Sequence, residues 1–220
     1  MAISESSIAR YTLHDPDVRL MLAVRDDDGS AFEELMRRYQ DRLITVLDHL
    51  VGNRDQAEDL AQDVFLRIYR SRKSYVPGAK FSTWLFTIAN NVASNARRSR
   101  SRRKEVNLDL RPATTTGIHS IDELAQAASG LMPTRQIDKA EMRDIVRSAI
   151  STLNERQRLA VLLSKFESMS YEDIAETMEM SPQAVKSLLS RARTNLREVL
   201  EPYLQTGAVK KDETHSNNNQ

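Results

Sequence analysis

The sequence contains no cysteine and few aromatic residues, and both shortages narrow the classes of protein that it can encode. Without cysteine, disulfide bonds, thiolate zinc sites and thiol nucleophiles are excluded. Aromatic residues make up 5%, apolar residues 40% and charged residues 29% of the 220 residues. β-Sandwiches and barrels usually carry more aromatic and β-branched residues. The composition therefore favours small helical bundles with large hydrated surfaces.

Long apolar runs and recognisable catalytic arrangements are also missing. No run of about 18 apolar residues occurs, and residues 1–19 lack an apolar core of signal-peptide length. The four histidines show no metal-ligand spacing, and there is no glycine-rich phosphate loop. We therefore expect a soluble cytoplasmic protein that is not an enzyme, has no membrane segment and binds no metal or cofactor. The histidines are His14, His49, His119 and His215.

The basic residues are unevenly distributed, although the net charge is only +1. One short segment contains Arg97, Arg98, Arg100, Arg102, Arg103 and Lys104 without an acidic residue. Such a block requires water or a polyanion around it, which indicates a nucleic-acid partner.

Hydrophobic periodicity divides the chain into two helical domains. Breaks at residues 26–30, 52–53 and 76–78 separate four amphipathic segments. Residues 105–137 differ, because they contain prolines, glycines and little periodicity. Only a weak helical pattern occurs there, at 121–128. The predicted fold class is all-α, with two small helical domains, a four-helix bundle and a helix-turn-helix domain, joined by a flexible linker. The predicted boundaries are a disordered N-terminus (1–17), a first domain (18–104), a linker (105–137), a second domain (138–204) and a disordered tail (205–220).

Start signals for helices are clearest in the second domain. Asn154 with Gln157, and Ser170 with Asp173, have the spacing of capping boxes, and Ser181 stands immediately before a proline. The helix after Ser170 is short, and the turn before Ser181 is tight. These features predict a DNA-binding helix-turn-helix.

The last helix is expected to enter a major groove with its N-terminal half. Glutamine and arginine can bond a base edge at two points, whereas Lys186 and Arg193 are better placed for phosphates. The alternative is that this helix only packs against its own domain and that its basic face is simply solvated. In that case the caps and the tight turn would be coincidences. The predicted DNA contacts are Gln183, Lys186, Ser187, Ser190, Arg191 and Arg193.

Several segments resemble regions of the bacterial sigma-70 family of RNA polymerase sigma factors. Those similar to region 4 are TLNERQR (152–158), MSYEDIA (169–175), SPQAVKS (181–187) and SRAR (190–193). Those similar to region 2 are QAEDLAQDVFL (56–66) and KFSTWLFTIANN (80–91). Their order and the intervening linker resemble the extracytoplasmic-function (ECF, group 4) factors, which keep only domains 2 and 4. One departure is Glu179, at a turn position that is usually glycine.

The resemblance implies a sigma factor that binds core RNA polymerase and directs promoter-specific transcription initiation. It places Asp59, Gln62, Asp63 and Leu66 against the clamp of the largest polymerase subunit, and residues 159–166 against the flap of the second-largest subunit. Carboxylates beside an amide would orient partner arginines and lysines. An anti-sigma factor is a further implied partner, and the free protein is expected to be a monomer.

The resemblance also implies that the second domain reads the −35 element as duplex DNA and that the first captures single-stranded −10 bases. Without a nucleotide site, the protein must open DNA by binding the unpaired state better than the paired one. Unstacking a DNA base costs a few kcal/mol. Stacking that base on a protein ring and hydrogen-bonding its edge return about the same amount. Tyr75 is the preferred candidate for base contact, because Trp84 and Phe81 also belong to an apolar stripe. The predicted −10 contacts are Tyr75, Lys80, Phe81, Thr83, Trp84, Thr87, Asn90, Asn91, Arg97 and Arg98.

Two other functions remain open from the sequence. A conventional helix-turn-helix transcription regulator would bind duplex operators alone and would not need the acidic face around Asp59. A DNA-processing enzyme such as a recombinase would need a nucleophile or a metal site, and the sequence offers neither in a recognisable arrangement.

Overall fold

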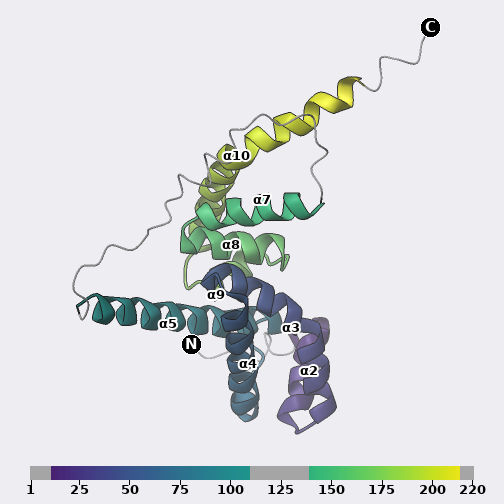
Figure 1. The fold of residues 1–220 in the computed structure, drawn as a ribbon. Helices are drawn as coiled ribbons and strands as arrows, with labels where there is room; N and C mark the ends of the chain where they lie inside the picture. Colours follow the sequence, from purple (N-terminus) through teal and green to yellow (C-terminus); the bar gives the residue numbers. More distant parts are fainter. Residues whose placement is uncertain (1–10, 110–138, 214–220) are drawn as a thin grey trace.

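The computed structural model describes residues 11–109 and 139–213, and every regular element in these ranges is a helix (Figure 1). The first domain contains α2 (Pro16–Arg25), α3 (Gly29–Val51), α4 (Arg54–Ser71), the 3-10 turn η1 (Arg72–Ser74) and α5 (Phe81–Asp109). The second contains α7 (Lys139–Thr152), α8 (Glu155–Lys165), α9 (Tyr171–Thr177) and α10 (Pro182–Glu213). The all-α prediction is therefore confirmed.

Local signals fix the ends of the helices in the first domain. Asp28 begins α3 by accepting the backbone N–H of Ser30 at 2.9 Å. Gly52 ends α3 with a φ of 72°, a left-handed conformation that glycine adopts at little cost. Asn53 then caps α4 by accepting the backbone N–H of Gln56 at 2.7 Å. The predicted breaks around these residues are confirmed.

The apolar stripes of α3, α4 and α5 meet in the interior of the first domain. From α4, Ala57, Ala61, Val64, Phe65 and Ile68 are buried at the spacing of an amphipathic helix, and Leu60 is partly buried. They belong to one apolar cluster with Leu35, Leu43 and Leu47 of α3 and Phe81, Leu85 and Val92 of α5. Removal of this apolar surface from water is the main favourable term in folding and holds the three helices together.

The first domain begins earlier in the chain than predicted, because Asp15 starts a helix. Oδ1 of Asp15 accepts the backbone N–H of Asp17 at 2.9 Å, and Pro16 occupies the first turn of α2. The expectation that residues 1–17 form a disordered N-terminus is therefore wrong for residues 11–17, which are described and mainly helical. The Asp-Pro-Asp sequence at residues 15–17 is therefore the start of a helix. Residues 1–10 lie outside the described ranges.

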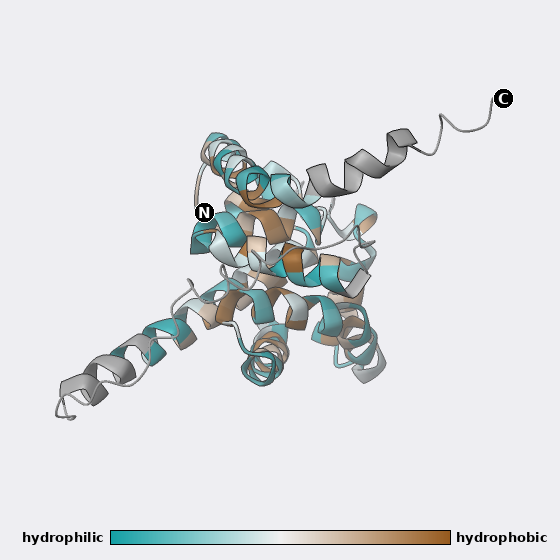
Figure 2. Cartoon of the chain, turned by 45° about the horizontal axis from the view of Figure 1, so that its top comes forward, coloured by the Kyte–Doolittle hydropathy of each residue, from teal (hydrophilic) through white to brown (hydrophobic). Residues whose placement is uncertain are grey.

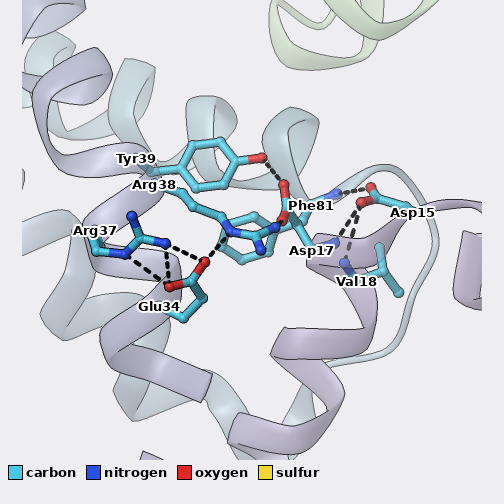
Figure 3. Close-up of polar contacts among 8 residues, drawn as sticks. All are labelled: Asp15, Asp17, Val18, Glu34, Arg37, Arg38, Tyr39 and Phe81. Atoms are coloured by element: carbon cyan, nitrogen blue, oxygen red, sulfur yellow. Dashed lines mark hydrogen bonds and ion pairs between the residues drawn. The ribbon is translucent and has the colours of Figure 1, made fainter. Parts of the chain in front are cut away.

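Asp17 connects α2 to α3 through two hydrogen bonds (Figure 3). Arg38 donates to its Oδ1 at 2.6 Å, and the Tyr39 hydroxyl donates to its Oδ2 at 2.5 Å. Burial, followed by the bond to Asp17, raises the pKa of Tyr39 well above its usual value, so the hydroxyl remains a donor. Figure 3 also shows Glu34 paired with Arg37 and Arg38 on the same helix.

Both long helices extend beyond the predicted domain boundaries. α5 continues to Asp109, past the expected start of the linker at residue 105, and α10 continues to Glu213, past the expected end at residue 204. The disordered-tail prediction is therefore wrong for residues 205–213, since α10 continues through Pro202. The rest of the predicted linker, with its weak helical pattern at 121–128, and residues 214–220 lie outside the described residues.

The two domains pack against each other (Figure 1). α9 lies against α5, and α8 lies against α3. The buried apolar cluster is continuous from one domain into the other and includes Leu153, Leu162 and Ile174 of the second domain. Apolar residues gather towards the centre of the molecule (Figure 2).

Candidate nucleic-acid interface

The helix-turn-helix consists of α9, a tight turn and the start of α10. Ser170 and Asp173 form the predicted capping box at the start of α9, with the Asp173 backbone N–H donating to Ser170 Oγ at 3.1 Å. Ser181 Oγ accepts the backbone N–H of Ala184 at 3.2 Å and caps α10. Glu179, in the turn, has a φ of 53°. The turn therefore keeps the left-handed geometry that glycine usually supplies, with glutamate in its place.

The N-terminal half of α10 divides into a buried face and an exposed face, as the sequence predicts. Val185, Leu189 and Ala192 are buried against the rest of the domain. The six predicted DNA contacts are all exposed: Gln183, Lys186, Ser187, Ser190, Arg191 and Arg193. Their side chains bond mainly within the helix, as when Ser187 Oγ donates to the Gln183 carbonyl at 3.1 Å. A polar helix face with this exposure can enter a major groove without rearrangement of the domain.

The predicted polymerase-binding residues lie on α4, opposite its buried stripe. Asp59 and Gln62 are exposed, and the Leu66 side chain is 51% exposed although it is apolar. Asp63 is half-buried and accepts a hydrogen bond from Arg67 at 3.0 Å. The structure thus brings all four predicted residues onto one accessible face, where two carboxylates flank an amide.

A groove beside this acidic face was not anticipated from the sequence. It lies between α3 and α4, with a volume of about 840 Å³, and Gln62 and Leu66 form part of its wall. Phe32 and Met36 line it from α3, and Tyr69 lines it from α4. No local pattern in the sequence marks Phe32 or Met36 as groove residues, so only the packing of the two helices reveals the groove.

Tyr75, the preferred candidate for base contact, is buried and not open to solvent. Its side chain is 6% exposed and packs on Trp84, with ring centroids 4.8 Å apart. Burial, followed by the negative charge of Asp15, raises the pKa of Tyr75 well above its usual value. Tyr75 is therefore not accessible to a base in this arrangement: although its loop contains proline and glycine, the ring belongs to the buried apolar cluster.

The start of α5 contains both buried and accessible residues among the predicted −10 contacts. Phe81 is fully buried beside Tyr39, and Thr83 is 1% exposed. Trp84 is partly buried, which makes it the most accessible ring of the three. The predicted contacts further along α5 are partly or fully exposed: Thr87, Asn90, Asn91, Arg97 and Arg98. The structure thus favours Trp84 over Tyr75 and Phe81 as the accessible aromatic group.

Lys80 and Thr83 contact the second domain directly. Lys80 Nζ donates to Oδ2 of Asp173 at 2.7 Å, and Thr83 Oγ1 donates to Oδ1 of the same carboxylate at 3.3 Å. The Thr177 hydroxyl donates to the Thr83 carbonyl at 3.4 Å. Burial alone would raise the pKa of Asp173, but hydrogen bonds from Lys80 and Ser170 outweigh it and hold that pKa below its ordinary value. Asp173 is therefore ionised at neutral pH.

Further polar contacts join the domains around this point. Arg42 pairs with Glu167, Arg97 pairs with Glu155, and Arg147 pairs with Asp48. Burial raises the pKa of Glu167, and the neighbouring Arg42 opposes that rise. These pairs were not predicted, because residues separated by a long linker leave no local pattern in the sequence.

Backbone and ring contacts also cross between the domains. Arg158 donates through Nη1 to the His49 carbonyl at 3.1 Å, and the rings of His49 and Phe166 lie 6.1 Å apart. Phe166 lies at the end of the segment that was expected to contact the polymerase flap. In that segment Leu159, Leu162 and Leu163 are buried, whereas the Phe166 side chain is 48% exposed.

Among the described residues, no cluster of three or more histidine, aspartate or glutamate side chains has an arrangement that could hold a metal ion. Within the same residues, no helix is long and apolar enough to span a membrane. The described residues form a helix-turn-helix with an exposed polar face on α10, an acidic face on α4 and a polar start of α5.

Together these features define a two-domain helical protein with a helix-turn-helix for DNA binding and a separate, exposed acidic face on α4. Two family models match the chain: Sigma-70 region 2 over residues 35–103 and Sigma-70 region 4 over residues 143–196. The first match covers the docking face and the start of α5, and the second covers the helix-turn-helix. Each matched range therefore contains the residues that were predicted for it.

Curated relatives extend over both matched regions. The chain is 31% identical to the RNA polymerase sigma-H factor of Pseudomonas aeruginosa over 192 residues, which are 86% of this chain and 96% of that protein. It is 29% identical to the ECF RNA polymerase sigma factor SigW of Bacillus subtilis over 177 residues, with 80% and 92% of the two chains covered.

A similar solved structure is the sigma factor RpoE of Bartonella quintana in complex with the anti-sigma factor NepR, with a TM-score of 0.59 and 27% identity. That match covers 77% of this chain and 96% of the other. The chain belongs to the ECF group of the sigma-70 family. Its two domains direct promoter-specific initiation of transcription by RNA polymerase.

Proposed function

We propose that α10 reads the −35 element of a promoter through its exposed polar residues. Gln183 and Arg191 would bond base edges, and Lys186 and Arg193 would bind phosphates on either side. The observation that carries this proposal is the exposure of all six predicted contacts on a helix whose opposite face is buried. Because the caps fix the start of α10, the reading residues are held in position before DNA arrives.

The docking face on α4 is the proposed contact with the polymerase clamp. Asp59, Gln62 and Leu66 are exposed and lie on the same face as Asp63. Two carboxylates can orient basic partner groups, while Gln62 offers a donor and an acceptor and Leu66 provides apolar area. This combination would fix how the α4 face aligns with the clamp as well as attract the two surfaces. In the second domain, Phe166 of the α8 segment is the accessible apolar group for the polymerase flap.

The start of α5 is the proposed surface for separated −10 bases. Trp84 can stack on a base, and Lys80 can hold a phosphate once it leaves Asp173. Asn90 and Asn91 present a donor and an acceptor to base edges, and Arg97 and Arg98 add positive charge to the same helix. A protein that binds the unpaired strand better than the duplex lowers the free energy of opening without hydrolysing a nucleotide.

A protein antagonist is the remaining proposed partner. The solved structure of RpoE of Bartonella quintana contains the anti-sigma factor NepR. In this chain, the α3–α4 groove and the acidic face adjoin each other, so an antagonist bound there would compete with the polymerase. We propose that the free protein is a cytoplasmic monomer that is available to either partner.

Transcription in vitro with purified core polymerase on a library of genomic DNA fragments tests the proposal. We expect transcripts whose start sites share upstream −35 and −10 motifs, and none when core polymerase acts alone. Asp59→Asn should weaken the association of the chain with core polymerase, whereas Asp55→Asn, which removes a charge from the first turn of the same helix, should not. If the free chain instead binds specific duplex sites tightly and never supports initiation, it is a conventional regulator.

A further inference from the structure

A small cavity lies beside the beginning of α5, on a different side of the helix from Trp84. Its volume is about 290 Å³, and Lys80 and Ser82 form part of its wall. Ser82 lies two residues before Trp84, and a helix turns by roughly 100° per residue, so the two side chains point to nearly opposite sides of α5. The proposed −10 surface uses Lys80 and Trp84 but leaves this cavity without a role.

Residues from two other parts of the first domain bring rings to the cavity. Tyr11 and His14 come from the segment before α2, and Tyr39 comes from α3. His14 is exposed and Tyr11 is partly buried, whereas Tyr39 is 3% exposed. Tyrosine and histidine rings are among the side chains on which proteins stack unpaired bases. The wall therefore suits a flat ring.

Two carboxylates line the same cavity and are held in place by hydrogen bonds (Figure 3). Asp15 accepts the backbone N–H of Phe81 at 3.0 Å, and Asp17 accepts one hydrogen bond at each oxygen, from Arg38 and from the Tyr39 hydroxyl. An ionised carboxylate has about four acceptor sites, so Asp17 can accept further hydrogen bonds. Two carboxylates disfavour an anionic ligand and suit a neutral group that carries N–H donors.

We infer that this cavity is a second base site, which takes an unpaired adenine or cytosine from the strand that the −10 surface holds. The exocyclic amino group of either base would donate to Asp17, and the Ser82 hydroxyl would bond a ring nitrogen. Thymine has no amino group, so the site would select against it. The inference rests on the proposed binding of −10 bases at the start of α5, and it adds the side of the helix and the class of base.

Lys80 connects the cavity to the proposed stacking position at Trp84. It lines the cavity, and its carbonyl accepts the backbone N–H of Trp84 at 3.2 Å, one helical turn further on. If one base stacks on Trp84 and its neighbour enters the cavity, the phosphate between them passes the beginning of the helix. Lys80 is the cation at that point, and it supplies the attraction for phosphate that the carboxylates do not.

A promoter with a preformed bubble tests the site without the step of strand opening. In the unpaired strand, adenine is placed at each position of the −10 element and its flanks and is then replaced in turn by purine, which lacks only the exocyclic amino group. Binding of the holoenzyme, made from core polymerase and the full chain, is measured for each pair. We expect one position at which the replacement weakens binding roughly tenfold, because a hydrogen bond to a carboxylate is lost.

Ser82→Ala and His14→Ala assign this effect to the cavity. Either variant should reduce the cost of removing the amino group by about two- to tenfold, because the base is held less closely to Asp17. Ser74→Ala is the control for the first variant, since the exposed Ser74 hydroxyl donates to the Ser71 carbonyl at 2.9 Å. Leu13→Ala, at the exposed position beside His14, is the control for the second. Both controls should keep the wild-type cost.

Two results would overturn the inference. One is a wild-type holoenzyme that is insensitive to the amino group at every position, and the other is an equal cost in the cavity variants and their controls. His14→Ala changes an exposed side chain outside α5, so the outcome does not depend on how Ser82→Ala affects the beginning of that helix. Failure of the proposed function looks different, because the holoenzyme would then not retain the bubble promoter with either base.

Discussion

The backbone N–H of Phe81 donates to Oδ2 of Asp15 at 3.0 Å, and these two residues join the beginnings of α5 and α2. The other oxygen of Asp15 accepts the backbone N–H of Asp17 at 2.9 Å, so one carboxylate satisfies donors at two helix starts. Because α5 carries the proposed −10 surface, this contact fixes where that surface begins relative to the rest of the bundle.

Replacement of Asp15 is expected to destabilise the first domain. Asp15→Ala leaves two helix starts without their acceptor, and each lost cap costs about 0.5–2 kcal/mol. We therefore expect the free energy of unfolding, measured by urea denaturation, to fall by about 1–4 kcal/mol. Asp26→Ala is the control, because Asp26 forms only an exposed pair with Arg25. Equal losses in the two variants would contradict a capping role for Asp15.

Glycine at position 179 is expected to stabilise the helix-turn-helix. Glu179 has a φ of 53°, and a left-handed conformation costs a residue with a Cβ about 1–2 kcal/mol. Part of the gain is offset because glycine is more flexible in the unfolded chain. Glu179→Gly should therefore raise the free energy of unfolding by roughly 0.5–1 kcal/mol. Glu179→Ala removes the same side chain but keeps Cβ, and it should give no such gain.

The hydroxyl of Tyr75 is expected to contribute nothing to stability. It is buried and has no hydrogen-bond partner among the described residues. Tyr75→Phe should leave the free energy of unfolding unchanged or raise it by up to about 1 kcal/mol, since an unsatisfied polar group is removed. Tyr39→Phe is the comparison, because the Tyr39 hydroxyl donates to Asp17 at 2.5 Å, and it should lower stability by about 1–2 kcal/mol. A large loss in Tyr75→Phe would show that its hydroxyl is bonded.

Lys186 is expected to contribute affinity for DNA but no sequence specificity. It is exposed on the reading face of α10 and is assigned to a phosphate. Lys186→Gln should weaken binding of the holoenzyme to all promoters by a similar factor and reduce the salt dependence of log K by about one unit. Arg156→Gln, at an exposed position on α8, is the charge-matched control. A change in promoter preference without a change in salt dependence would assign Lys186 to a base instead.

Mild acid is expected to destabilise the chain through His49. Burial, followed by the positive charge of Arg147, lowers the pKa of His49 below its ordinary value of 6.5, with Arg158 acting in the same direction and Asp48 opposing them. Between the two pKa values the unfolded chain binds the proton and the folded chain does not. The contribution of His49 to the free energy of unfolding is therefore fully present above a pH of about 6.5 and is lost as the pH falls below that value.

Urea denaturation at pH 7.5 and pH 5.5 measures this loss. We expect a smaller free energy of unfolding at the lower pH, with a slope of at most about 1.4 kcal/mol per pH unit from one proton. His49→Gln removes the titrating group, so the pH dependence of the wild type should exceed that of the variant. Equal pH dependence in the two proteins would exclude His49 as the cause.

Features that depend on nearby residues could be predicted from the sequence. The capping boxes at Asn154 and Ser170 and the buried stripe of α4 follow from patterns within a few residues, whereas the turn position at Glu179 was marked by the family resemblance. The exposed face of α10 follows in the same way, because helical periodicity that buries Val185 and Leu189 leaves Gln183 and Lys186 outside.

Features that depend on distant residues were decided only by the tertiary structure. The burial of Tyr75, the α3–α4 groove and the bond between Lys80 and Asp173 need helices from different parts of the chain. Asp15 shows the difference within one residue: its cap on α2 has a local signature, but its bond to Phe81 does not. Helix periodicity and capping are short-range, whereas packing brings together groups separated by long stretches of chain, and a single sequence carries no pattern for such pairs.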